Sequence, residues 1–113
     1  MAVSPKCLLE PSLLTTSTFG YYAVNKGVTI IDKMTLVNTS STLFIIVSVY
    51  LVPSGITLSN THAIIKSFTL SPNETYEVAK AEGHVLNIGD SIHAIAGTGS
   101  LVSFRVSGRE VAV

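Results

Sequence analysis

The alternation of apolar and polar positions along the chain predicts short β-strands joined by turns. The pattern is clearest in residues 101–107, where Val102, Phe104 and Val106 are separated by polar residues. Alternation of this kind is typical of a strand with one buried face. No segment shows the 3.6-residue period of an amphipathic helix, so the chain is expected to be all-β.

Turn signals rich in Gly, Pro, Asn, Ser and Asp divide the chain after residue 18 into eight strands. The predicted strands are 19–24, 28–38, 43–52, 62–70, 74–80, 84–86, 91–96 and 101–107. Strand 28–38 is expected to place Val28, Ile30, Met34 and Leu36 on one face and to form an antiparallel hairpin with 43–52. The spacing predicts an eight-stranded antiparallel sandwich over 19–113, jelly-roll-like, with an immunoglobulin-like sandwich as the main alternative.

Residues 1–18 differ from the rest of the chain. Two leucine pairs, Leu8-Leu9 and Leu13-Leu14, flank a Glu-Pro-Ser segment, and a run of hydroxyl residues follows. Two prolines and the hydroxyl run argue against regular structure, so we expect an extended N-terminal arm. Leucines on such an arm would dock either on a neighbouring subunit or on the arm's own sandwich, and the sequence leaves both alternatives open.

The segment 43–52, LFIIVSVYLV, is apolar on both faces of its predicted strand. Ile45, Val47 and Val49 share one face, while Phe44, Ile46 and Tyr50 lie on the other. A sandwich covers only one face of each sheet with the other sheet, and a large exposed apolar patch usually marks an interaction site. Either the arm or a second chain is therefore expected to cover the second face. The predicted contact residues are Leu8, Leu9, Leu13, Leu14, Phe44, Ile46 and Tyr50.

Composition narrows the range of functions. Hydrophobic residues make up 47% of the 113 residues, charged residues only 12%, and the formal net charge is zero. Nucleic-acid and anionic-membrane binding normally need clustered Lys and Arg, whereas the seven basic residues here are scattered. No run reaches the 18 to 20 or so apolar residues of a membrane helix. We therefore expect no nucleic-acid partner and no membrane partner.

The residues that could carry chemistry form no recognisable pattern. The one cysteine, Cys7, lies between apolar neighbours and is expected to be a buried or half-buried thiol. His84 and His93 with Asp90 are the most conceivable zinc ligands, but they lack a metal-binding spacing, and Asp90 is better interpreted as a turn residue. No nucleophile elbow or phosphate-binding loop is present. We therefore expect no enzyme activity, no catalytic residue, no metal and no cofactor.

Five segments, in their order along the chain, resemble small virion proteins of tailed bacteriophages. They are IIDKMTLVNTSS (30–41), VSVYLVPSG (47–55), HAIIKSFTLSPNETYEV (62–78), HVLNIGDSIHAIA (84–96) and VSGRE (106–110). Their common features are a strand ending in Val-Asn-Thr, a Pro-Ser-Gly turn, a Pro-x-Glu-Thr-Tyr turn, a Gly-Asp-x-Ile turn and a final Ser-Gly-Arg-Glu. Residues 1–18 carry no resemblance.

Among such proteins, this size and strand pattern look most like capsid decoration proteins, also called cement or staple proteins. The resemblance implies a jelly-roll-like sandwich that binds the outside of the shell, often as a homodimer or higher oligomer, and bridges major capsid protein subunits. It implies location on the virion surface after synthesis in the host cytoplasm. A tail, baseplate or fibre-associated virion protein is one alternative, and a glycan-binding β-sandwich is another.

Overall fold

The computed structural model describes residues 3–17, 19–25 and 27–111, apart from the side chains of 3–6, 9–11 and 19. The described residues form nine strands and two short 3-10 helices. The elements are β1 (Val3–Leu13), β2 (Phe19–Ala23), β3 (Val28–Asn38), β4 (Ile45–Val52), η1 (Asn60–His62), β5 (Ala63–Leu70), β6 (Thr75–Glu77), η2 (Ala79–Ala81), β7 (Val85–Leu86), β8 (Ser91–Ala96) and β9 (Val102–Val111).

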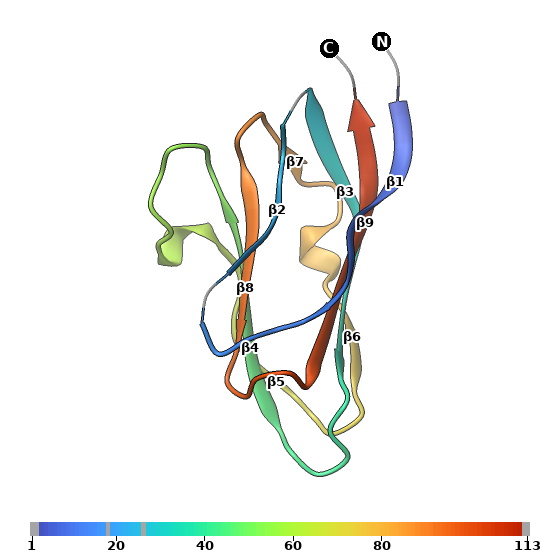
Figure 1. The fold of residues 1–113 in the computed structure, drawn as a ribbon, viewed down its shortest axis with the longest axis vertical. Helices are drawn as coiled ribbons and strands as arrows, with labels where there is room; N and C mark the ends of the chain where they lie inside the picture. The colour runs from blue at the N-terminus through green and yellow to red at the C-terminus, as the bar shows by residue number, and fades with distance from the viewer. Residues whose placement is uncertain (1–2, 18, 26, 112–113) are drawn as a thin grey trace.

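The strands form two antiparallel sheets that pack face to face (Figure 1). One sheet has the order β1–β9–β3–β6, with β7 also paired to β3, and the other has the order β2–β8–β4–β5. The pairs are nested: β1 pairs with β9, β2 with β8, β3 with β6 and β7, and β4 with β5. Such nesting is the strand order of a jelly roll. The predicted all-β sandwich is confirmed.

The first strand, β1, belongs to the sandwich. It pairs with β9 from Val3 opposite Val111 to Leu13 opposite Ser103, with two register shifts between Cys7 and Ser12. The expectation of an extended arm without regular structure is therefore wrong for residues 3–13. β1 is an edge strand, where prolines are tolerated because one side of the backbone has no neighbouring strand. The two bulges also interrupt the alternation that identifies a strand in a sequence.

A β-bulge in β3 changes which residues face the core. Ile31 pairs with Gly108 and Lys33 with Ser107, so Asp32 is an extra residue in β3. Such a residue reverses the alternation of side chains along the strand. Met34 and Leu36 face the core as predicted.

Before the bulge, the inward residues are Thr29 and Ile31, both fully buried. The prediction that Val28 and Ile30 lie on the same face as Met34 is wrong for this reason. Gly108 fits this irregular region because a Cβ at its position would collide with the carbonyl oxygen of Ile30. A β-branched or bulky residue there would force β3 and β9 apart.

The predicted hairpin between β3 and β4 is also wrong, because residues 39–44 cross from one sheet to the other. Asn38, which is fully buried, holds this crossing. Its Nδ2 donates to the carbonyl oxygens of Leu43 (2.8 Å), Leu70 (3.2 Å) and Ser71 (3.1 Å). Its Oδ1 accepts a hydrogen bond from the backbone N–H of Ser40 at 3.0 Å. One buried amide thus fixes the end of β3, the crossing and the end of β5.

The core lies between the two sheets and is built from residues of nearly every strand. The inward set predicted for the last strand, Val102, Phe104 and Val106, is fully buried. The largest fully buried side chains are Phe104, Leu14, Ile31, Met34, Leu36, Ile45, Leu70 and Ile92. Leu14 comes just after β1. Its side chain packs in the core between the two sheets and therefore has no surface exposed to a neighbouring chain.

Candidate protein-binding surface

Much of the outer face of β4 is covered by the chain itself. Ser48, Tyr50 and Val52 are at most 5% exposed, although they point away from the core. The Lys66 ammonium donates to the Tyr50 hydroxyl at 3.0 Å and lies 5.5 Å from the centre of its ring. The segment that carries η1 contacts β4 and lies outside the sandwich (Figure 1). Neither a second chain nor the N-terminal segment is needed to bury Tyr50, so this burial gives no support to its predicted contact role, which stays a prediction.

The start of β4 and the two residues before it remain uncovered. Leu43, Phe44 and Ile46 are 46%, 67% and 52% exposed, whereas Ile45 between them is 1% exposed. This alternation places Phe44 and Ile46 on the same outer side of the chain. We call Leu43, Phe44 and Ile46 the docking patch. Two of its three members were predicted as contact residues, and their exposure leaves them free to contact a partner.

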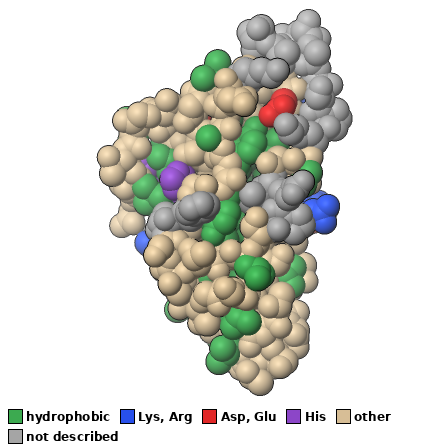
Figure 2. Space-filling view, in the orientation of Figure 1, with side chains coloured by type: hydrophobic (Ala, Val, Ile, Leu, Met, Phe, Trp, Pro, Cys, Tyr) green, Lys and Arg blue, Asp and Glu red, His purple; other side chains and the backbone are tan. Residues whose placement is uncertain are grey.

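A shallow hollow of about 220 Å³ adjoins the docking patch on the outer face of the β2–β8–β4–β5 sheet. Its lining residues are Thr16, Ile46, Ser48, Ile95, Ala96 and Gly97. Leu43 and Ile95 were not predicted as contact residues. For Ile95 a signal was present, because the inward alternation of Ile92, Ala94 and Ala96 leaves Ile95 on the outside. Figure 2 shows hydrophobic side chains in separate groups on one side of the molecule, with few charged groups between them.

The three N-terminal leucines whose side chains the structure describes do not lie on this surface. Leu8 and Leu14 are 7% and 0% exposed and belong to the core, so their burial gives no support to the predicted contact role, which stays a prediction. Leu13 is 49% exposed, but it pairs with Ser103 and therefore lies on the outer face of the opposite sheet. The side chain of Leu9 lies outside the described part of the chain.

Further exposed hydrophobic residues lie in turns away from the patch. Ile56 and Ile88 are 55% and 60% exposed. Their turns are joined by Asp90, whose carboxylate accepts the backbone N–H groups of Ser54 at 2.9 Å and Asn87 at 2.8 Å. The predicted role of Asp90 as a turn residue is confirmed, and its carboxylate is already engaged.

The three histidines form no metal site with other side chains that the structure describes. His93 Nε2 lies 2.9 Å from the Ser91 hydroxyl, and burial lowers the pKa of His93 below its ordinary value of 6.5. His62 Nδ1 accepts the backbone N–H of Ser59 at 3.1 Å. Within residues 3–17, 19–25 and 27–111, no three His, Cys, Asp or Glu side chains gather closely enough to hold an ion.

A small polar network joins the two sheets near the other end of the sandwich. The Tyr22 hydroxyl donates to Glu110 Oε2 at 3.0 Å and lies 3.0 Å from the hydroxyl of the buried Thr29. Burial raises the pKa of Tyr22, so its phenol stays protonated and keeps donating at neutral pH. The network connects β2 with β3 and β9, and its role is to hold the two sheets together.

The thiol of Cys7 is exposed, and its Sγ lies 3.9 Å from the carbonyl oxygen of Val106. The expectation of a buried or half-buried thiol is wrong because Leu8, its neighbour in β1, takes the inward position. Among the helices of the described residues, none is long and apolar enough to span a membrane.

Comparison with known proteins adds no relative to this structural description. No protein-family model, no curated protein and no solved structure matches the chain.

Proposed function

We propose that this chain is a structural protein of a tailed-phage virion, a capsid decoration protein that binds the outer shell and bridges major capsid protein subunits. The observation that carries the proposal is the docking patch, three large hydrophobic side chains left bare on a jelly-roll sandwich. A hydrophobic patch beside a shallow hollow is the anatomy expected of a protein-binding surface.

The charge of the chain supports the same proposal. Only 12% of the residues are charged and the net charge is zero, so little ionic hydration is lost when such a surface is covered by another protein. The order of the resembling segments adds support from the sequence. Many copies on one particle would multiply a modest affinity per site through multivalency, and such a role requires no chemistry.

The first experiment is co-sedimentation of the purified chain with emptied phage heads and, separately, with tails. We expect wild-type protein to pellet with heads. The double variant Phe44→Ser/Ile46→Ser should bind at least about tenfold more weakly, because apolar anchors at an interface centre carry most of the binding free energy. Ile56→Ser is the matched control, since it removes an equally exposed isoleucine outside the patch.

Three results would count against the proposal. Pelleting with tails alone would favour the tail, baseplate or fibre alternative. Failure to pellet with either particle would reject a virion role. Equal binding by the double variant and wild type would reject the docking patch as the contact surface. Circular dichroism of both variants checks that the fold is retained.

A further inference from the structure

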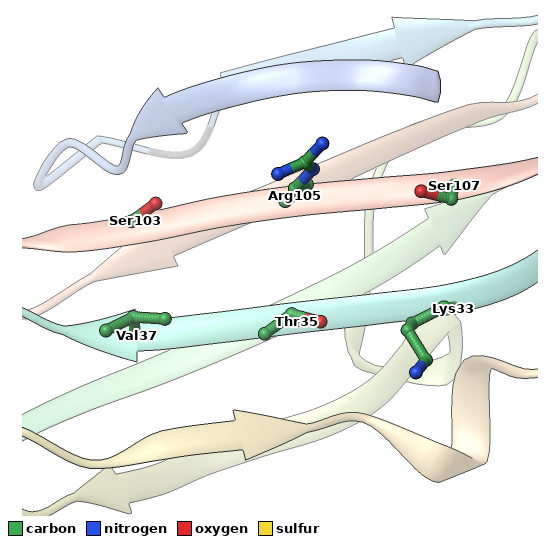
Figure 3. A pocket seen from close by; sticks show the side chains of 6 residues that line it. All are labelled: Lys33, Thr35, Val37, Ser103, Arg105 and Ser107. Atoms are coloured by element: carbon green, nitrogen blue, oxygen red, sulfur yellow. The ribbon is translucent and has the colours of Figure 1, made fainter. Parts of the chain in front are cut away.

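The outer face of the β1–β9–β3–β6 sheet carries a groove that the proposed function does not use. Its volume is about 460 Å³, within the range of small-molecule sites. The lining residues are Lys33, Thr35, Val37, Ser103, Arg105 and Ser107 (Figure 3). The docking patch belongs to the opposite sheet, so the two surfaces face away from each other.

The groove is built from three cross-strand pairs of β3 and β9, every second pair along the two strands. Lys33 lies opposite Ser107, Thr35 opposite Arg105, and residue 37 opposite residue 103. The β-bulge at Asp32 determines which residues of β3 face the groove. After the bulge, every second residue from Lys33 onward points outward, in alternation with the buried Met34 and Leu36. Figure 3 shows Arg105 leaning toward β1 and Lys33 leaning to the opposite side, with short side chains on the floor between them.

Among the cations on this face whose side chains the structure describes, Arg105 is the one without an ion pair. Lys33 Nζ lies 2.9 Å from Glu77 Oε1, and Arg109 holds the carboxylate of Asp32 with contacts of 3.0 and 3.1 Å. Within the described part of the chain, Arg105 has no ion-pair partner, and the groove lining contains no carboxylate. A guanidinium in this state presents its planar set of N–H donors to an incoming carboxylate.

The position of the groove argues against a bound peptide strand. β3 and β9 are interior strands with a neighbour on each side, so their backbone groups are already paired and cannot accept an added strand. A ligand must be recognised by side chains. The hydroxyls of Thr35, Ser103 and Ser107 both donate and accept hydrogen bonds, which suits the hydroxyl groups of a sugar.

We propose that this groove binds a carboxylate-bearing saccharide, with Arg105 on the carboxylate and the three hydroxyl side chains on the ring hydroxyls. This inference is independent of the proposed function. On a particle it would give the chain one surface for docking and another for holding an acidic glycan.

The experiment measures binding of the full chain to a panel of galacturonate, glucuronate and sialic-acid oligosaccharides by isothermal titration calorimetry. Methyl esters of the same oligosaccharides and a hexaglutamate peptide complete the panel. We expect an acidic saccharide to bind, its ester to bind about tenfold more weakly or worse, and added salt to weaken binding.

The decisive variant is Arg105→Gln, which removes the charge but keeps a long polar side chain. It should lose about tenfold or more in affinity for the acidic saccharide, and Thr35→Val should lose affinity by a smaller factor. Arg109→Gln is the matched control, since this arginine lies on the same strand but is held by Asp32. It should bind within about twofold of wild type, in line with the small effect expected of a residue outside the site.

The binding measurements would overturn the inference if they gave no binding of any acidic saccharide in the millimolar range, equal affinity for acid and ester, unchanged affinity of Arg105→Gln, or preference for hexaglutamate. Amide chemical-shift changes on saccharide addition should map to β3 and β9, and changes confined to the other sheet would also overturn it. Because the docking patch is intact in all these variants, head binding reports separately on the proposed function.

Discussion

The hydroxyl of Ser48 accepts a hydrogen bond from the backbone N–H of Ser67 at 2.9 Å. Ser67 has a positive φ of 53° and lies where the register of β5 against β4 is shifted. A bulge leaves a backbone N–H without a ladder partner, and the one polar residue within the apolar β4 receives it. The Ser48 hydroxyl therefore has a hydrogen-bonding role within the chain, on the covered part of the outer face of β4.

Ser48→Ala should destabilise the protein by about 1 kcal/mol, because it leaves the part-buried Ser67 N–H without its acceptor. The free energy of unfolding in urea is the measurement. Thr69→Ala, at an exposed position of the same strand pair, is the control and should change stability by less than about 0.5 kcal/mol. Equal stability of Ser48→Ala and wild type would show that water satisfies the N–H instead.

Removal of residues 1–14 should unfold the protein, since it takes away the partner of β9 together with Leu8 and Leu14 from the core. Loss of the cooperative thermal transition is the readout. An arm outside the sandwich, as expected from the sequence, would instead leave the remaining sandwich folded when it is removed. A native-like cooperative transition in the truncated chain would instead support an N-terminal arm that lies outside the sandwich.

Point substitutions separate the leucines by role. Leu14→Ala should cost about 2–4 kcal/mol of unfolding free energy, as is usual for a leucine deleted from a tight core. Leu13→Ala, one position earlier but half exposed, should cost under about 0.5 kcal/mol. Similar losses from the two substitutions, measured by urea denaturation, would contradict the assigned register of β1.

Asn38→Ala should destabilise the protein by about 2–4 kcal/mol, because one buried carbonyl group, two part-buried carbonyl groups and the buried Ser40 N–H lose their partner at once. Equilibrium unfolding by fluorescence or circular dichroism measures the loss. Asn25→Ala removes an exposed asparagine and serves as the control. If both variants were equally stable, the crossing between the sheets would not depend on this amide.

Burial lowers the pKa of His93. The direction of this shift determines whether the stability of the fold rises or falls with pH. The unfolded chain binds the proton more readily than the folded chain, so stability rises with pH in this range. The contribution is complete above the ordinary pKa of 6.5 and is lost as the pH falls toward the lower folded pKa. His93→Gln should therefore flatten the decline in urea midpoint between neutral and acidic pH. An unchanged slope for His93→Gln would contradict the burial effect.

Alternation along the chain predicted most strands because it reports on one strand and its two faces. Residues 91–96 and 28–38 form β8 and β3 with the predicted bounds. The alternation failed as a predictor where an extra residue interrupts its two-residue period, which happens at Asp32 in β3 and twice in β1. It also could not show that residues 39–44 cross between sheets, because partner choice depends on distant contacts such as Asn38 with Leu70.

The exposure of the residues in the docking patch was predicted in part, for the same physical reason. Phe44 and Ile46 were expected on the outer face, and they are exposed there. Tyr50 was assigned to the same surface because a strand pattern does not show that a loop and a lysine side chain will cover it. The groove around Arg105 was not predicted, since its depth comes from side-chain lengths across paired strands.

The pairing of β1 with β9 constrains how the molecule is made. Cys7 and Val106, which meet across this pair, are 99 positions apart in sequence. During synthesis on the ribosome, β1 therefore has no partner until β9 has emerged from the exit tunnel. Contacts of such long range slow the search for the native state, and meanwhile the leucines of β1 stay open to chaperones and to aggregation.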